Sequence, residues 1–353
     1  MSRFFNKRLT ALEPYTPGEQ PQDMKYIKLN TNESPYEPSE KVIKALAERK
    51  LTENIRLYPD PECTRVRKLL AKVLGVESDN VVLTNGSDEA LAFVFMAFCE
   101  NGVIFPEISY GFYKVFAELY GVKYRQIPLL DDFSIDYRDY IGTDETVVIA
   151  NPNAPTGIYM TLDKIEEIVK SDTDRLVIID EAYIDFGGES AVALTKKYDN
   201  LIVVGTFSKS RSMAGARLGF AVGNTDIIRD MNTVRFSTNP YNINSMTLAA
   251  GEKTLEDNDY YMENCRKIIK TREYFTEKMR EMGFEVIDSK CNFVFARHNL
   301  IGGREYYEEL KARGILVRHF DKEKIRDYNR ITIGTDEMMR ELLSVTKSIL
   351  ENR

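Results

Sequence analysis

The sequence predicts an α/β protein in which a large domain, built on a mostly parallel sheet flanked by helices, is followed by a smaller α+β domain. Short runs of apolar and β-branched residues alternate with helix-length segments through the middle of the chain, a pattern typical of a parallel sheet covered by helices. From about residue 257 this alternation gives way to one long charged segment and shorter elements. The length of 353 residues exceeds one typical domain, which agrees with a division into two.

The first forty residues are rich in proline and turn-forming residues. Such a segment suits an arm that crosses the surface better than it suits a domain. We therefore expect an arm over residues 1–40, the large domain over 41–256 and the small domain over 257–353.

Apolar runs and helical periodicity place the elements. In the large domain we expect strands at 81–83, 102–105, 146–149, 176–179 and 201–204, with helices that include 88–98 and 161–170. In the small domain we expect a helix from 257 to 281, a strand at 292–295, a helix at 304–313, strands at 315–317 and 330–333, and a terminal helix. Ligands of a parallel sheet bind at the carboxyl ends of its strands, so we look there for the site.

The composition excludes several classes of protein. Hydrophobic residues make up 43% and charged residues 29%, which are ordinary values for a chain with a sizeable core. The net charge of −7 argues against a nucleic-acid partner or an anionic membrane. The four cysteines are far apart without a C-x-x-C motif, and there are only two histidines, so we expect neither a metal site nor disulfides. With no apolar span of membrane length, we expect a reduced, cytoplasmic protein.

Lys209 follows the apolar run 201–204 and lies between Ser208 and Ser210. Where a buried strand ends, desolvation favours the neutral amine of a lysine, which can attack a carbonyl group and form a Schiff base. The alternative is an ordinary lysine that extends its amine from the strand end to solvent.

Asp180 stands at the end of another apolar run, 176–179. A carboxylate there needs a cationic or hydrogen-bonding partner, and it could also be a helix N-cap. A Schiff-base lysine combined with an aspartate that holds a pyridinium nitrogen is typical of enzymes that use pyridoxal 5'-phosphate (PLP). The two residues together therefore indicate PLP as the cofactor.

A phosphate site is expected where the strand at 81–83 turns at Gly86 into a helix. Free backbone N–H groups at Ser87 and Asp88 could bind a phosphate, with Arg217 as a second ligand, although these two residues could also form a simple N-cap. Tyr110, after another strand, could stack on a ring or pack in the core.

Three further segments have more than one possible role. The run 151–157, with two prolines and a glycine, predicts a tight turn in which one X-Pro bond can be cis. Arg318 and Arg330 each stand at the edge of a small-domain strand and could bind an anionic substrate, although surface arginines at strand edges are common.

Taken together, these motifs resemble the fold-type I PLP-dependent aminotransferases, and most closely the histidinol-phosphate aminotransferases. The resemblance covers nearly the whole chain. It rests on nine motifs in the family's order: Pro14-Tyr15-x-Pro17-Gly18, Leu29-Asn30-x-Asn32-Glu33, Tyr58-Pro59-Asp60-Pro61, Gly86-Ser87-Asp88-Glu89, Tyr110-Gly111, Asp180-Glu181-Ala182-Tyr183, Ser208-Lys209, Arg217-x-Gly219 and Arg330-Ile331-Thr332-Ile333-Gly334.

The resemblance implies an aspartate aminotransferase-like fold and a role for each matching residue. Lys209 would form the Schiff base, Asp180 would pair with the pyridine nitrogen, Tyr183 would bond the phenolic oxygen, and Tyr110 would stack on the ring. The phosphate ligands implied are Ser87, Asp88, Ser208, Arg217 and, from the neighbouring subunit of a homodimer, Tyr58. The substrate-binding residues implied are Tyr15, Asn32, Arg318 and Arg330.

One position departs from the family's N-P-N-N-P-T-G run. Its fourth residue, which bonds the phenolic oxygen, is Ala154 in this chain. Either Asn153 takes over that contact through a shifted turn, or Tyr183 makes it alone.

The function implied is ping-pong transamination of L-histidinol phosphate with 2-oxoglutarate, a step of histidine biosynthesis. An aromatic or broad-specificity amino-acid aminotransferase is a close alternative, because phosphate and carboxylate can use the same arginines. Threonine-phosphate decarboxylase shares the motifs but cleaves a different bond. A non-catalytic PLP-binding regulatory protein is the non-enzymatic alternative, and no basic DNA-binding segment is left over to support it.

Overall fold

The computed structural model describes residues 2–10 and 12–352, so positions 1 and 11 of the predicted arm and position 353 of the predicted small domain lie outside the described residues. The largest sheet has seven strands in the order β2-β8-β7-β6-β5-β3-β4. Their bounds are β2 (Val81–Thr84), β3 (Val103–Pro106), β4 (Tyr124–Ile127), β5 (Thr146–Ala150), β6 (Val177–Asp180), β7 (Leu201–Thr206) and β8 (Gly219–Val222).

All neighbouring strands of this sheet run parallel except β8, which is antiparallel to both β2 and β7. The mostly parallel sheet is thus confirmed. In the register, Ala150 pairs with Asp180 and Asp180 with Val204, so β5, β6 and β7 end side by side. Thr84 and Thr206 both pair with Gly219, which brings the start of β8 to the same edge.

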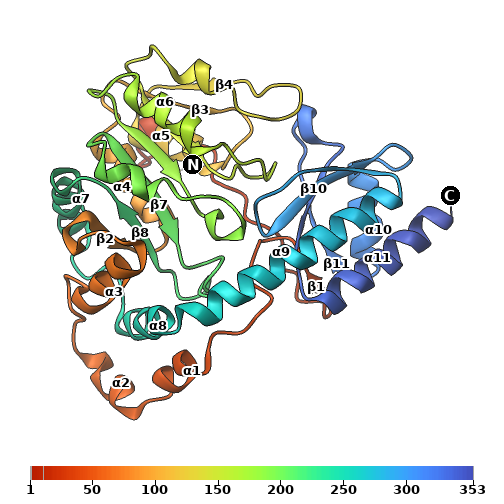
Figure 1. The fold of residues 1–353 in the computed structure, drawn as a ribbon, viewed down its shortest axis with the longest axis horizontal. Coiled ribbons are helices and arrows are strands. Elements are labelled where there is room, and N and C mark those ends of the chain that lie inside the picture. The colour runs from red at the N-terminus through yellow and green to blue at the C-terminus, as the bar shows by residue number, and fades with distance from the viewer. Residues whose placement is uncertain (1, 11, 353) are drawn as a thin grey trace.

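Helices cover both faces of the seven-stranded sheet (Figure 1). Residues alternate between the faces along each strand, as the two-residue period of a strand requires. On β6, Val177 and Ile179 belong to a core that includes α3, α6 and α8, whereas Ile178 belongs to the core formed with α4, α5 and α7. The bounds are α3 (Thr64–Leu74), α4 (Ser87–Ala97), α5 (Phe112–Tyr120), α6 (Leu162–Lys170), α7 (Thr225–Thr238) and α8 (Ser245–Glu256).

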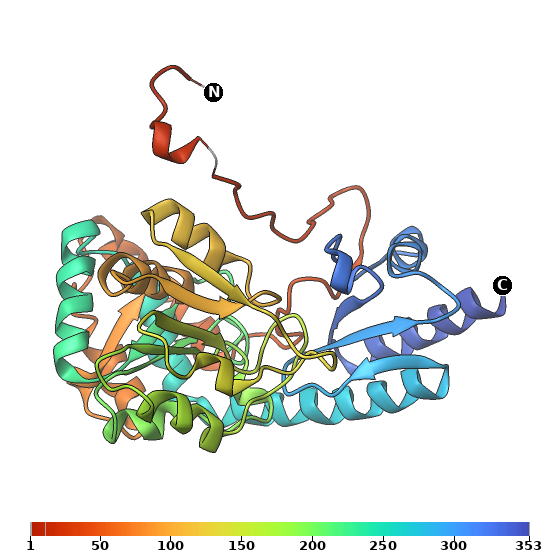
Figure 2. The same cartoon turned by 90° about the horizontal axis from the view of Figure 1, so that it is seen from above.

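A second body is built on a four-stranded antiparallel sheet in the order β12-β13-β10-β9. Its strands are β9 (Phe284–Ile287), β10 (Phe293–His298), β12 (Arg318–His319) and β13 (Asn329–Thr332), and its helices are α9 (Asn258–Glu281), α10 (Gly303–Ala312) and α11 (Asp336–Glu351). The long helix α9 runs beneath both bodies and connects them (Figures 1 and 2).

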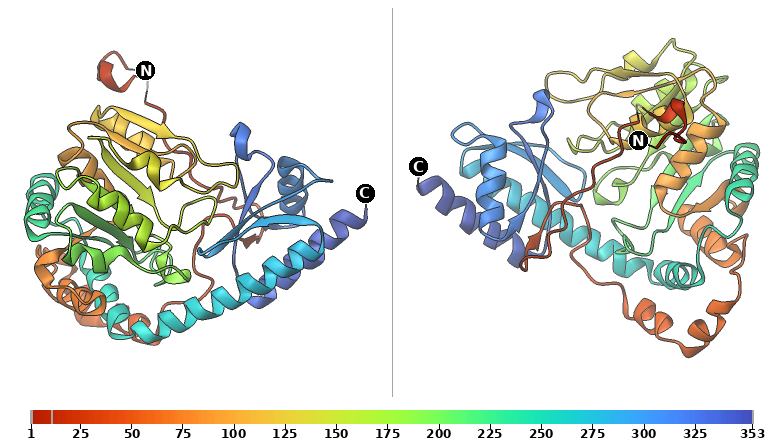
Figure 3. Two further views of the ribbon diagram at one scale, coloured as in Figure 1. Left: turned by 45° about the horizontal axis from the view of Figure 1, so that its top comes forward. Right: turned by 180° about the vertical axis from the view of Figure 1, so that it is seen from behind.

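The N-terminal segment lies along the outside of the large body (Figure 2), where Arg8 donates to the Leu119 carbonyl at 3.3 Å, and then crosses toward the second body (Figure 3, right). There β1 (Ile27–Lys28) pairs in parallel with β11 (Ile315–Leu316). Part of the predicted arm therefore forms a strand against the C-terminal body. Two short helices follow, α1 (Glu40–Leu46) and α2 (Arg49–Glu53).

Seven short 3-10 helices complete the described residues: η1 (Lys7–Leu9), η2 (Asn54–Arg56), η3 (Ser78–Asn80), η4 (Tyr137–Tyr140), η5 (Ile184–Phe186), η6 (Ala191–Lys196) and η7 (Glu323–Ile325). Both prolines of the predicted turn, Pro152 and Pro155, follow cis peptide bonds, where the sequence pointed to one. A search of the described residues finds no helix with the length and apolarity needed to cross a membrane.

Candidate active site

A cavity of about 130 Å³ opens where the strands of the large sheet end. Its lining comes from the segments that follow β2, β3, β5, β6 and β7: Ser87, Asp88, Tyr110, Ala150, Ala154, Asp180, Ala182, Tyr183, Thr206, Ser208, Lys209 and Arg217. The carboxyl edge of the sheet is where an α/β fold offers free backbone groups and diverging loops. Eight of the predicted residues thus meet in one cavity.

Lys209 lies in the loop after β7, and its Nζ donates to the backbone carbonyl of Thr31 at 3.3 Å. The amine also lies 5.9 Å from the centre of the Tyr183 ring. Burial, reinforced by the positive charge of Arg330, lowers the pKa of Lys209 to about 8. A substantial fraction of this amine is therefore neutral near physiological pH, as a nucleophile or general base requires.

Asp180 is the last residue of β6 and is 5% exposed. Its carboxylate accepts from the Tyr113 hydroxyl at 2.9 Å and from the Ala182 N–H at 3.2 Å. Burial raises the pKa of Asp180 to about 6, although both bonds favour its charged form. No helix begins at Asp180, since the next helical turn is η5, so it is not an N-cap. Its charge is available to a cationic ligand group in the cavity.

Tyr183 faces Asn32, whose Nδ2 donates to the tyrosine hydroxyl at 2.9 Å. Asn32 has a left-handed backbone with φ of 56°, and its side-chain oxygen accepts from Thr332 at 3.0 Å. Burial raises the pKa of Tyr183 to about 12, so the hydroxyl keeps its proton and can donate it to a ligand oxygen.

The start of α4 forms an anion site. Gly86 occupies the N-cap position with φ of 76°, and no side chain caps the helix, so Ser87 and Asp88 are not the simple N-cap considered above. A Cβ on Gly86 would lie 2.4 Å from Arg217 Nη2, and one on Gly219 would lie 2.3 Å from the Gly86 carbonyl carbon. Only glycines allow the arginine and the helix N-terminus to converge this closely.

Asp88 bonds two of the donors around this site. It accepts from Arg217 Nη2 at 3.0 Å and from the Tyr110 hydroxyl at 2.7 Å. The Ser208 hydroxyl accepts from Thr206 Oγ1 at 2.9 Å. Backbone N–H groups, a guanidinium and hydroxyls are the donors that a phosphate prefers.

The side chain of Asn153 does not line the cavity. Its Nδ2 donates to the Ile108 carbonyl at 2.9 Å and to Thr156 at 3.2 Å, and its Oδ1 accepts from Ser109 at 2.8 Å. These bonds turn the amide of Asn153 away from the cavity, while the methyl group of Ala154 lines it. The geometry therefore favours the alternative in which Tyr183 alone bonds the phenolic oxygen.

The residues expected to bind substrate lie around the cavity rather than in its lining. Arg330 on β13 donates to the Asn30 carbonyl at 3.0 Å, with its guanidinium carbon 5.3 Å from the Phe293 ring centre. Arg318 on β12 donates to the carbonyls of Thr16 and Pro17, which lie next to Tyr15.

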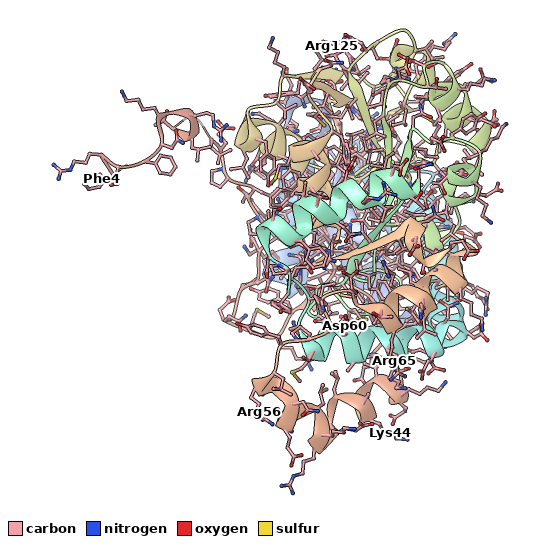
Figure 4. The ribbon with its side chains drawn as sticks, turned by 90° about the vertical axis from the view of Figure 1, so that its left-hand side faces the viewer. Phe4, Lys44, Arg56, Asp60, Arg65 and Arg125 are labelled. Carbon is pink, nitrogen blue, oxygen red and sulfur yellow. The ribbon has the colours of Figure 1, made fainter. Side chains whose placement is uncertain are left out.

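Tyr58 lies outside the cavity altogether. Its side chain is 80% exposed and stacks on Tyr241 with ring centres 4.3 Å apart. The segment that leads to it protrudes from the body, as the positions of Lys44 and Arg56 show (Figure 4).

Sequence reasoning missed two contacts at the centre of the site. Tyr113 donates to Asp180, and its place in the aromatic run 110–113 could have drawn attention to it. The carbonyl of Thr31 accepts from Lys209 across 178 positions of sequence, and no local signal predicts that contact.

Comparison with known proteins identifies the family of this chain. Residues 24–345 match the family model of class I and II aminotransferases. The chain belongs to this aminotransferase family. It is 50% identical to a histidinol-phosphate aminotransferase from Brachyspira hyodysenteriae over 100% of both chains. It is 46% identical to one from Clostridium beijerinckii, over 100% of this chain and 99% of the relative.

Solved structures of aminotransferases have the same fold as this chain. The histidinol-phosphate aminotransferase of Clostridium acetobutylicum has a TM-score of 0.84 at 27% identity, covering 92% of this chain and 99% of that one. The enzyme of Sinorhizobium meliloti, in complex with pyridoxal-5'-phosphate, has a TM-score of 0.89 over 99% of both chains at 23% identity, a likeness of fold. The fold is therefore the fold type I of the aspartate aminotransferases.

The cofactor of the aminotransferase is PLP, and the residues of the cavity fit it. The uncapped start of α4 with Arg217 is suited to the phosphate, Asp180 to the ring nitrogen and Lys209 to the aldehyde carbon.

Proposed function

We propose that the protein transfers the amino group of L-histidinol phosphate to 2-oxoglutarate, as a step of histidine biosynthesis. The observation that carries this proposal is the 50% identity to a histidinol-phosphate aminotransferase over the full length of both chains. Threonine-phosphate decarboxylase shares the fold at 23% identity, which supports the fold alone.

The residues of the cavity divide the chemistry among them. Bound PLP supplies a carbonyl carbon for the donor amine and a ring that takes up the electron pair left when the α-proton leaves. Lys209, with its pKa near 8, is neutral often enough to remove a proton from the α-carbon of the donor. Its protonated form would then return that proton to the former carbonyl carbon of PLP. Asp180, ionised above about pH 6, holds a proton on the ring nitrogen.

The remaining residues orient the reactants. Tyr183 would donate a hydrogen bond to the phenolic oxygen of PLP, and Tyr110 would pack against its ring. The phosphate ligands are the N–H groups at Ser87 and Asp88 together with Ser208 and Arg217. Arg330 and Arg318 bind the phosphate of the donor and then a carboxylate of 2-oxoglutarate, with Tyr15 and Asn32 beside them.

A homodimer completes the site, because Tyr58 of each subunit reaches the cofactor phosphate of the other. The exposed side chains of Ile55, Leu57 and Tyr58, which are 65%, 51% and 80% exposed, support a protein partner for this segment. The four cysteines are free and buried, which suits a reducing, cytoplasmic compartment.

The experiment that tests this function follows the absorption spectrum of the PLP-loaded protein as single amines are added. We expect L-histidinol phosphate to convert the cofactor to its amino form with a higher kcat/KM than phenylalanine, tyrosine or aspartate. Faster conversion by an aromatic amino acid would support the broad-specificity alternative. Release of carbon dioxide from threonine phosphate would identify a decarboxylase, and no reaction with any amine would identify a binding protein.

A further inference from the structure

An ion pair between buried Arg211 and half-buried Asp185, outside the cavity lining, joins the loop that carries Lys209 to the turn that carries Tyr183. Arg211 Nη1 donates to Asp185 Oδ2 at 2.8 Å, and the Arg211 side chain is 7% exposed. Ser210 Oγ donates to the same carboxylate oxygen and accepts from Arg211 Nη1 at 3.0 Å. Arg211 Nη2 donates to Asn258 Oδ1 at 3.1 Å. These four residues are called the Arg211 cluster below.

The Arg211 cluster joins two segments of the active site to helix α9. Asp185 follows Tyr183 by two residues on η5, and Ser210 directly follows Lys209. Asn258 is the first residue of α9, the helix that runs beneath both bodies (Figure 1). The bonds of the cluster therefore fix the backbone on either side of the cavity relative to one another and to α9.

Helix α9 holds the same turn from a second side. Arg272 Nη1 donates to the Phe186 carbonyl at 2.8 Å and to the Cys291 carbonyl at 2.7 Å. The turn at 184–186 is thus fixed through Asp185 by the Lys209 loop and through Phe186 by α9. A turn held at two points has little freedom to move Tyr183 or Asp180 away from Lys209.

A single ion pair with one partly exposed partner adds little to the stability of the fold, because solvent weakens the attraction and ordering the two side chains costs entropy. The position of the ion pair suggests a different role, because it joins the loop of Lys209 to the turn of Tyr183. We propose that Asp185 and Arg211 are positioning residues that hold Lys209 in register with Asp180 and Tyr183. This inference deepens the proposed function, because it matters for catalysis only if Lys209 is the reacting amine.

The consequence can be measured on Lys209 itself. Its pKa is lowered mainly by burial, and the charged groups that act on it are Arg330, Glu33, Asp88, Arg217 and Asp180. Loosening the Arg211 cluster admits water around the amine, which restores part of its hydration and raises the pKa. A rise of about one unit lowers the neutral fraction of Lys209 at pH 7 about tenfold.

The experiment measures the pH dependence of amine labelling at Lys209 in the full-length, cofactor-free protein, with a trace amine-reactive anhydride and peptide mass spectrometry. The wild-type inflection is expected near pH 8, and Asp185→Asn should move it up by about one unit. Ser210→Ala, which removes one bond to Asp185, should move it by less and serves if Asp185→Asn does not fold. In the PLP-loaded protein, both half-reactions should slow with little change in KM.

A matched control separates positioning from general destabilisation. Arg175 is another buried arginine, 3% exposed, whose guanidinium donates to the carbonyls of Tyr140 and Ile168 far from the cavity. Arg175→Lys should lower the melting temperature without moving the Lys209 inflection. An unchanged inflection in folded Asp185→Asn, or in Ser210→Ala where Asp185→Asn does not fold, overturns the proposal. A shifted inflection in a protein that ignores histidinol phosphate would reject the proposed donor and leave the positioning role standing.

Discussion

At the scale of the residue, the site depends on two ionisable groups whose pKa values are displaced toward each other. Burial raises the pKa of Asp180 to about 6 and lowers that of Lys209 to about 8. Both pKa shifts come from desolvation of the charged form. The free energy that this desolvation costs is supplied by the rest of the fold. A ligand that carries a cation to Asp180 and reacts with Lys209 would relieve both costs, which supports the proposal that PLP binds in this cavity.

The cost at Asp180 can be measured as a pH-dependent stability. Since the folded pKa lies above the unfolded value near 4, the charge of Asp180 destabilises the fold as pH rises from about 4 to 6. Asp180→Asn in the cofactor-free protein should therefore gain up to about 3 kcal/mol relative to wild type between these pH values. Urea unfolding at pH 4.5, 6 and 7.5 measures this difference, which should shrink when PLP is added.

A second aspartate provides the control of opposite sign. Hydrogen bonds from Ser134 lower the pKa of Asp132, so its charge stabilises the fold above the unfolded pKa and this contribution is lost at low pH. Asp132→Asn should therefore lose stability relative to wild type as pH rises. The same pH trend in both variants would show that Asp180 is not desolvated as described.

Replacing Arg330 should show whether one arginine binds the anionic group of both substrates. Its Nε has no hydrogen-bond partner among the described residues, and its guanidinium packs over Phe293 and Phe320. A charge-assisted contact contributes roughly 1.5–3 kcal/mol. Arg330→Ala should lower kcat/KM for histidinol phosphate by about one to two orders of magnitude and slow the glutamate half-reaction too, with PLP affinity nearly unchanged.

Arg297 offers a matched comparison for Arg330. It lies on the adjacent strand β10 and pairs with Glu285 at the surface. Arg297→Ala should leave both half-reactions near the wild-type rate. A loss confined to one half-reaction in Arg330→Ala would mean that different residues bind the phosphate and the carboxylate.

At the scale of the element, sequence patterns found the strands of the large sheet that are dense apolar runs and missed β4 and β8. Strands β2, β3, β5, β6 and β7 lie within one or two residues of their predicted bounds, because each is a dense apolar run. β4, with the sequence Tyr-Arg-Gln-Ile, is an edge strand whose central residues are exposed, so it lacks that signal. β8, Gly-Phe-Ala-Val, is short and contains two small residues.

Some helices and some site residues could likewise be predicted from sequence, and others could not. α4, α6 and α9 were predicted, whereas α3, α5, α7 and α8 were not, although the apolar positions of α3 have a helical period. Residues that end a predicted strand, such as Asp180, could be assigned to the site from sequence. Contacts between distant segments could not, as with Asn32 and Tyr183, which are 151 positions apart.

The junction of β8 with α4 yields a prediction about the phosphate site. A Cβ on Gly219 would lie 2.4 Å from the Ser87 nitrogen, so Gly219→Ala must displace the start of α4. We expect PLP affinity to fall at least about tenfold, equivalent to 1.4 kcal/mol, as measured by equilibrium titration of the cofactor. Gly215→Ala in the same loop, where a Cβ meets nothing within 4 Å, should bind PLP as the wild type does. Equal affinities for the two variants would exclude this site for the phosphate.

At the scale of the whole molecule, the exposure of Tyr58 agrees with the homodimer proposed above. The tyrosine is 80% exposed, stacks only on Tyr241 among the described aromatic rings, and follows a segment that protrudes from the body at Lys44 and Arg56 (Figure 4). A side chain so exposed contributes little to the stability of its own subunit. Its proposed contact with the cofactor phosphate of a second subunit gives it a function that the single chain does not.

Mixing two inactive chains tests this arrangement. At a PLP concentration that leaves Tyr58→Phe largely unloaded, neither this variant nor Lys209→Ala should turn over. If each site takes Lys209 from one subunit and Tyr58 from the other, a heterodimer of the two has one site without either change. Activity should therefore appear after the two chains are mixed under conditions that exchange subunits. Two Tyr58→Phe preparations mixed in the same way are the control, and an active monomer in sedimentation would contradict the shared site, because a monomer would carry both groups in one chain.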